Sequence, residues 1–206
     1  VKEVILGDEN AENVVLMELF PEKQKTRIDF WATRNALGIE IVCMTKIVKE
    51  GKQLFYEKEG RKTQINRIYN RVILDELVRI KDLKVNFKFS DDLDVEWVTH
   101  PDWFSTISKC NMPTLKHKNI PNSFYLNEYP ENLDLSKYVL KPLFSFAGQG
   151  IDLHPKQEVI DTIVDKQNYI LQQKVDYAWL VKTNTEKNSK VELRILYIWS
   201  KTENRL

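Results

Sequence analysis

The stretch YVLKPLFSFAGQGID occupies residues 138–152, and the predicted elements of the second half of the chain lie on either side of it. Its first residues have the composition of a short β-strand, which leads to Lys141, a residue that cannot continue the apolar pattern. Pro142 and a loop containing Gly148 and Gly150 follow. Glycine accepts positive φ, and consecutive N–H groups in such a turn form a concave site for anions. The stretch therefore predicts either a phosphate clamp or a β-hairpin loop whose glycines serve only the turn.

The overall composition is that of an ordinary globular protein, with 42% hydrophobic and 30% charged residues among 206. A net charge of +1 predicts neither a nucleic-acid partner nor an anionic membrane partner. No apolar run approaches the roughly 18 residues of a membrane helix, and the first residues lack the apolar core of a secretory signal. Cys43 and Cys110 form no metal-ligand spacing with the three scattered histidines. We therefore expect a cytoplasmic protein with free thiols and no transition-metal cluster.

The first part of the chain predicts a strand, a helix and a second strand in close succession. The strands cover residues 14–20 and 39–44, and the helix covers residues 22–37, with Gly38 ending it in a left-handed conformation. The predicted inward face carries residues at 3- and 4-residue spacing: Ile28, Trp31, Ala32 and Asn35. Such a βαβ unit implies a parallel sheet.

A solvated, protruding hairpin is predicted next, over residues 47–56, with its turn at Glu50 and Gly51. A strand over residues 65–69 then ends in Asn70 and Arg71. Because open α/β sheets bind ligands at the carboxyl ends of their strands, these two residues are candidate substrate contacts; otherwise they are polar loop caps.

A helix over residues 72–83 and a short strand over residues 95–98 complete the predicted first domain, residues 1–100. The second domain, residues 101–206, opens with a helix over residues 103–111 that carries Lys109. A strand at 123–126, the hairpin of the opening stretch and a helix at 156–165 follow.

Two strands near the end of the chain contain polar residues in unusual places. The strand over residues 169–175 includes Gln172 and Gln173, whose amides can hydrogen-bond a planar base. The strand over residues 191–199 carries Glu192 and Arg194, which share a face because they are two residues apart. They form either an exposed ion pair of little energetic value or, given the apolar surroundings, a half-buried pair that faces a ligand.

The order of these motifs resembles the ATP-grasp superfamily, and most of all its glutathione-synthetase-like branch. The resemblance rests on Val139-Leu140-Lys141-Pro142, the loop at 145–150, Leu171-Gln172-Gln173-Lys174-Val175 and Glu192-Leu193-Arg194, with Ser108-Lys109-Cys110 and Ile120-Pro121-Asn122-Ser123 upstream. It implies an α/β protein with an N-terminal βαβ domain of the pre-ATP-grasp type, followed by a partial ATP-grasp α+β domain. It covers the chain well from about residue 101 and only loosely before that.

The resemblance implies a set of ATP-binding residues. Lys141 and Lys109 would contact the α- and β-phosphates. The loop would close over the phosphates through its backbone N–H groups: Ser145, Ala147, Gly148, Gln149 and Gly150. Gln172 would face the adenine amine, and three following residues would hold the base edge through their backbone: Gln173, Lys174 and Val175. Asp176 would reach the ribose.

The resemblance also implies a reaction, in which a carboxylate is joined to an amine or thiol through an acyl-phosphate. Arg194 would stabilise the transferred phosphoryl group and Glu192 would orient it, because fixed cations neutralise the charge of phosphoryl transfer. Asn70 and Arg71 are the candidate contacts for the second substrate, a small carboxylate or peptide-like molecule. The sequence indicates neither the particular substrates nor the oligomeric state.

One departure from the family concerns Mg²⁺. The family places its metal ligands, an acidic residue and a Glu-x-Asn group, beyond the Glu-x-Arg strand, whereas this sequence ends at Arg205-Leu206. We therefore expect either a fragment, with its metal ligands beyond residue 206, or a degenerate site with little activity of its own. A nucleotide-binding module with a regulatory or assembly role, and a purely structural α/β domain, are the alternatives to a ligase.

Overall fold

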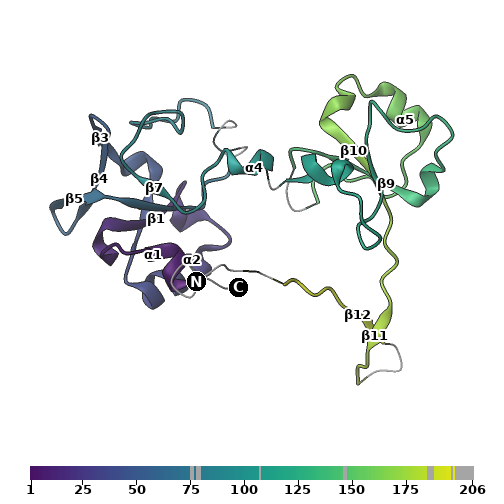
Figure 1. Ribbon diagram of the computed structural model, residues 1–206. Coiled ribbons are helices and arrows are strands. Elements are labelled where there is room, and N and C mark those ends of the chain that lie inside the picture. Colours follow the sequence, from purple (N-terminus) through teal and green to yellow (C-terminus); the bar gives the residue numbers. More distant parts are fainter. Residues whose placement is uncertain are drawn as a thin grey trace. The chain divides into compact units, whose positions relative to one another are not determined.

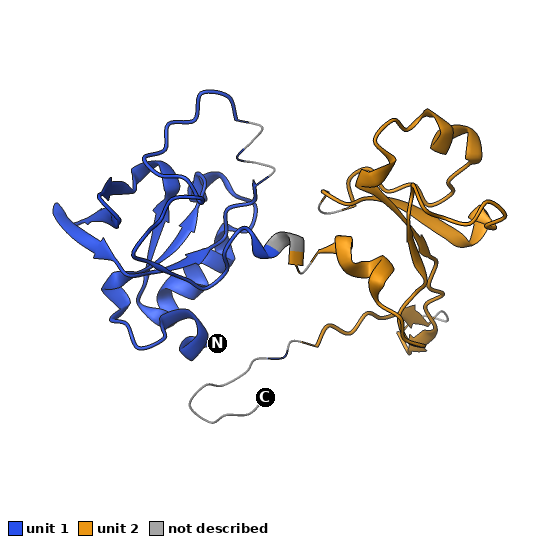
Figure 2. Ribbon diagram, turned by 45° about the horizontal axis from the view of Figure 1, so that its top comes forward, with its two compact units in different colours: residues 1–103, 197–206 blue, residues 104–196 orange. Residues whose placement is uncertain are grey.

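The computed structural model describes residues 1–74, 77, 80–106, 108–145, 148–184, 188–195 and 197. The chain divides into two compact units, Val1–Trp103 and Phe104–Leu196, coloured blue and orange in Figure 2. Helices are combined with parallel and antiparallel sheets, so the chain is of the mixed α/β class. No helix in the described ranges is both long and apolar enough to cross a membrane.

Unit 1 consists of short helices and two sheets, and Figure 1 labels several of these elements. The helices are α1 (Lys2–Leu6), η1 (Ala11–Asn13), η2 (Pro21–Lys23), α2 (Arg27–Leu37) and η3 (Met44–Lys46). The strands are β1 (Val14–Glu18), β2 (Glu40–Cys43), β3 (Val48–Glu50), β4 (Gln53–Lys58), β5 (Arg61–Ile65), β6 (Arg67–Asn70) and β7 (Glu96–Trp97).

Strand β1 is the centre of unit 1. The parallel sheet has the order β2-β1-β6-β7, and all five residues of β1 are buried. Its alternate residues enter different cores: Val14 and Leu16 pack with α1 and α2, whereas Val15 and Met17 pack toward the β3-β4-β5 sheet. The predicted βαβ unit and its parallel sheet are confirmed.

The helix of this βαβ unit differs in phase from the prediction. Phe30 is 1% exposed, whereas Ile28 and Trp31, predicted to face inward, are 74% and 51% exposed. The helix also begins at Arg27, because the chain first makes the 3₁₀ turn η2. Gly38 ends it in the left-handed conformation, as predicted, and donates its N–H to the carbonyl oxygen of Arg34.

The predicted hairpin is confirmed, with β3 and β4 antiparallel around Gly51. The prediction that it protrudes as a solvated arm is wrong, because β5 adds a third strand and the sheet packs on the core. Leu54 and Tyr56 are buried on its inner face, and Gln53, Phe55 and Glu57 alternate with them. Ile65 ends β5, so the following strand begins only at Arg67.

The helix predicted over residues 72–83 falls partly outside the described residues, which omit 75, 76, 78 and 79. Within the described part, Leu77 donates its N–H to the Ile73 carbonyl oxygen and packs against the core of unit 1.

Unit 2 has a three-stranded antiparallel sheet of order β8-β10-β9. Its strands are β8 (Ser123–Tyr125), β9 (Tyr138–Pro142) and β10 (Tyr169–Gln173), and β11 (Trp179–Val181) pairs separately with β12 (Ser189–Lys190). Its helices are α4 (Trp103–Thr106, which starts at the last residue of unit 1), η4 (Lys109–Thr114), η5 (Leu135–Lys137), α5 (Gln157–Thr162) and η6 (Lys166–Asn168).

Three predicted elements of unit 2 require correction. The single helix over residues 103–111 is two pieces, because Ser108 accepts the Cys110 N–H and begins the 3₁₀ helix η4. Of the hairpin arm expected from residue 151, Asp152 alone bridges to Leu140 among the described residues. The strand over residues 191–199 is absent from the described residues 191–195 and 197, where Leu193 is 82% exposed.

The phase of α2 can be tested by two alanine substitutions. Phe30→Ala removes a fully buried ring and is expected to lower the free energy of unfolding by about 3–5 kcal/mol. Ile28→Ala, the matched control on the exposed face, is expected to cost less than about 0.5 kcal/mol. Urea denaturation measures both values. A larger loss of stability for Ile28→Ala than for Phe30→Ala would contradict this orientation of the helix.

Tyr56 makes unit 1 sensitive to alkaline pH. Burial raises the pKa of its phenol to about 12, and the hydroxyl donates to the Glu12 carbonyl oxygen at 2.8 Å. Between about pH 10 and 12 the unfolded chain loses this proton while the folded chain keeps it, so the free energy of unfolding falls as pH rises. We expect Tyr56 to contribute at most about 2 kcal/mol of that fall.

The measurement is urea denaturation of the native protein and Tyr56→Phe at pH 8 and at pH 11.5. The variant should lose less stability between the two pH values, because phenylalanine has no proton to release. An equal loss in both proteins would contradict the assignment.

Candidate functional site

The ladder between β9 and β10 separates two faces of the unit 2 sheet. Leu140 lies opposite Leu171, and both are buried in a core with Ile160 of α5. Successive residues of a strand point to opposite faces. Lys141 and Gln172, each next to one of these leucines, therefore lie on the other face. This second face, called here the lysine face, carries Ser123 of β8, Val139 and Lys141 of β9, and Ile170 and Gln172 of β10.

Lys141 lies across this face and does not extend into bulk solvent. Its amine donates a hydrogen bond to the side-chain oxygen of Gln172 on the neighbouring strand. The residue is half-buried, and the loss of hydration lowers the pKa of its ammonium group from the ordinary value of 10.5. Both residues belong to the ATP-binding set that the resemblance implies, and the structure places their side chains in contact.

Lys109 joins the same region from η4. Its amine donates to the carbonyl oxygen of Ser145 at 3.0 Å and to the hydroxyl of Ser145 at 2.8 Å. The helix is held against β8 by Tyr125, whose hydroxyl donates to the Cys110 carbonyl oxygen at 2.7 Å. Lys141 therefore precedes the loop at 145–150, and Lys109 is hydrogen-bonded to Ser145, the first residue of that loop.

The glycines of the loop are explained by backbone geometry. Gly148 has φ 79° and Gly150 has φ 69°, values that favour glycine. A Cβ on Gly150 would lie 2.8 Å from Cγ of Pro142, whereas a Cβ on Gly148 meets nothing within 4 Å. Gln149 is exposed, and Ala147 lies outside the described residues. Gly150 is thus required by the turn itself, whether or not the loop also holds a phosphate.

The residues after Gln172 already have partners within unit 2. The N–H of Gln173 donates to the Asn122 carbonyl oxygen, and that of Lys174 donates to the Lys137 carbonyl oxygen, each at 2.8 Å. Val175 and Asp176 are exposed. These two N–H groups are therefore engaged in the fold, so any contact with a base edge falls to the other backbone groups of this segment.

Glu192 and Arg194 do not join the lysine face through any described contact. Arg194 Nη2 lies 3.5 Å from Glu192 Oε1, and their side chains are 63% (Glu192) and 80% (Arg194) exposed. The expectation of a half-buried, ligand-facing pair is wrong, since it needed a paired strand that the described residues do not form. An exposed pair of this kind contributes little to stability.

Asn70 and Arg71 serve the fold of unit 1. Asn70 is buried, and its side-chain oxygen accepts the Val72 N–H at 3.1 Å in an Asx turn. The guanidinium of Arg71 lies over the rings of Phe30 and Tyr69, with centroid distances of 5.5 and 6.0 Å. The structure therefore supports the alternative interpretation of Asn70 as a loop cap.

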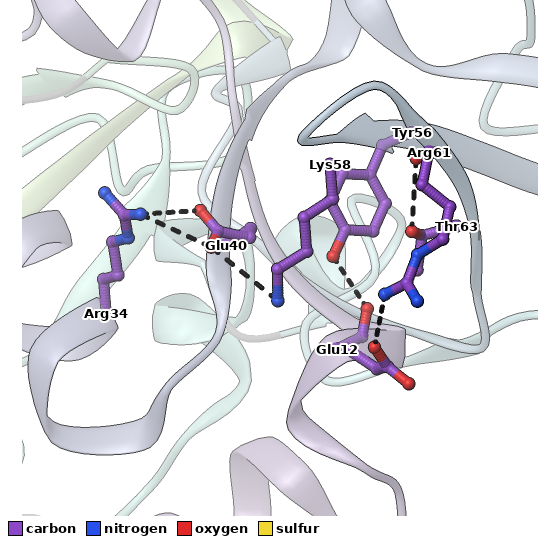
Figure 3. Close-up of polar contacts among 7 residues, drawn as sticks. All are labelled: Glu12, Arg34, Glu40, Tyr56, Lys58, Arg61 and Thr63. Carbon is purple, nitrogen blue, oxygen red and sulfur yellow. Dashed lines mark hydrogen bonds and ion pairs between the residues drawn. The ribbon is translucent and has the colours of Figure 1, made fainter.

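A cleft of about 730 Å³ in unit 1 was not predicted. Figure 3 shows Glu40 of β2 between two cations of its lining, Arg34 and Lys58. The one sequence signal was a glutamate inside the otherwise apolar strand predicted over residues 39–44.

In comparisons with known proteins, no family model and no curated protein sequence matches this chain. Among the described residues, no group of three or more histidine, cysteine, aspartate or glutamate side chains is placed to hold a metal ion.

The turn requirement at Gly150 gives a matched test. Gly148→Ala and Gly150→Ala both place a side chain at positive φ, which costs about 1–2 kcal/mol. Gly150→Ala also drives the new methyl group into Pro142 and is expected to cost at least about 1 kcal/mol more. Urea denaturation of the two variants gives the comparison, and equal losses would contradict this packing.

Proposed function

We propose that unit 2 binds ATP on the lysine face, and that the protein uses ATP to join a carboxylate to an amine or thiol through an acyl-phosphate. The observation that carries the ATP-binding part is the convergence of two lysines on the segment around the loop at 145–150. Lys141 leads into this loop and Lys109 bonds its first residue. Support for the ligase part comes from the order of the sequence motifs.

The chemistry of the lysine face suits a triphosphate. A half-buried ammonium group loses part of its hydration on folding, and this loss lowers its pKa. An anionic phosphate would restore the lost stabilisation through charge-assisted hydrogen bonds. Gln172 keeps the amine on the face by accepting a hydrogen bond from it, and a bound phosphate would replace Gln172 as the acceptor.

The adenine would lie toward Gln172, whose amide offers both a donor and an acceptor to a base edge. ATP in such enzymes is bound together with Mg²⁺, which neutralises phosphate charge. The described residues offer no cluster of metal ligands, so the proposal assigns no residue to the metal.

A second candidate function is nucleotide binding without turnover. It is favoured by the exposure of Arg194 and Glu192, which the ligase reaction would use at the phosphoryl group. The two candidates differ in one measurement: ADP release in the presence of amino acids and short peptides supports the ligase, and binding without ADP release supports the module.

Titration calorimetry with Mg-ATP tests the binding proposal. Lys141→Ala is expected to weaken binding about 10- to 100-fold, the loss that follows from removing a charge-assisted hydrogen bond. The control is Lys156→Ala, an exposed lysine before α5, which should leave affinity unchanged. Absence of heat with the native protein at millimolar nucleotide, or equal affinity of the two variants, would refute the site.

A further inference from the structure

The cleft in unit 1 runs along the edge of a strand. All four consecutive residues of β2, Glu40–Cys43, line it. A cleft over the face of a sheet is lined by every second residue of a strand, because side chains alternate between faces. Four consecutive lining residues therefore place this cleft beside the backbone of β2.

That edge of β2 is unpaired in the described part of unit 1. The sheet order β2-β1-β6-β7 makes β2 an outer strand, and β1 occupies its inner edge. An outer edge presents backbone N–H and C=O groups to any extended chain that lies against it. The opposite wall of the cleft is the end of the β4–β5 hairpin, including Tyr56 and Lys58.

Charges of both signs line the cleft. Arg34 Nη2 lies 3.1 Å from Glu40 Oε2, and Lys58 Nζ lies 4.0 Å from Glu40 Oε1, so two cations share one carboxylate (Figure 3). This cluster has one positive charge in excess, and the three side chains are 24–38% exposed. Glu22 and Glu57 supply negative charge elsewhere in the lining.

We propose that this cleft binds a short peptide with free termini, in an extended conformation, as an added strand along β2. Main-chain hydrogen bonds to the edge supply the affinity, as in other cases of strand addition. The terminal carboxylate suits the Arg34 and Lys58 cluster, and the terminal ammonium suits the carboxylates of the lining. A volume of about 730 Å³ lies within the usual size of ligand pockets, and β2 offers four residues for pairing. The proposal does not depend on ATP binding by unit 2.

The test is NMR titration of the whole protein, labelled with ¹⁵N, with the tetrapeptide Ala-Val-Ala-Val carrying free termini. Amide shifts are expected to concentrate in β2 and at residues 56–59. A second peptide, methylated on its three internal amide nitrogens, keeps the same termini but cannot donate from either edge. We expect it to bind at least about tenfold more weakly.

Two protein variants test the role of charge. Arg34→Gln is expected to weaken the tetrapeptide severalfold, whereas Arg61→Gln, whose partner is the exposed Glu12, should not. The native protein with the methylated peptide keeps the test valid even if Arg34→Gln alters the fold. Absence of shifts at about 10 mM peptide, equal binding of the methylated peptide, or equal binding by both variants would overturn the proposal.

Discussion

The register of a single strand pair, Leu140 opposite Leu171, decides what unit 2 can do. Burying these leucines against α5 forces the alternate residues, Lys141 and Gln172, onto the opposite face. A slip of one residue would turn the lysine into the leucine core and move the leucines onto the lysine face. Because a buried charge without a partner costs several kcal/mol, the packing of the leucines also fixes Lys141 on the lysine face.

Among the described residues of unit 1, the burial of β1 determines which edge of β2 stays unpaired. Strand β1 buries both of its faces and both of its edges, so it is purely structural. Strand β2 shares one edge with β1 and leaves the other beside a charged cleft. In both units, then, the groups proposed to contact a ligand lie beside a strand whose apolar residues are buried in a core. This is the common physical basis of the two proposals.

Features that depend on a local sequence pattern could be predicted. Features that depend on contacts with residues far away in the sequence could not. Gly38 was predictable because positive φ favours glycine at a helix end. The phase of α2 was not, since Ile28 and Phe30 are both apolar and only the position of the sheet selects between them. No strand forms in the described part of 191–199, residues 191–195 and 197, because apolar alternation permits a strand but provides no partner for it. Glu40 meets Lys58 across two elements, and no sequence spacing indicates that contact.

The most direct test of the ATP site is acylation footprinting of the lysines in the native protein, with and without Mg-ATP, read by mass spectrometry. The account predicts that nucleotide protects Lys141 and Lys109 from the reagent and leaves exposed Lys156 as reactive as before. Unchanged modification of Lys141 and Lys109 at saturating nucleotide would contradict it.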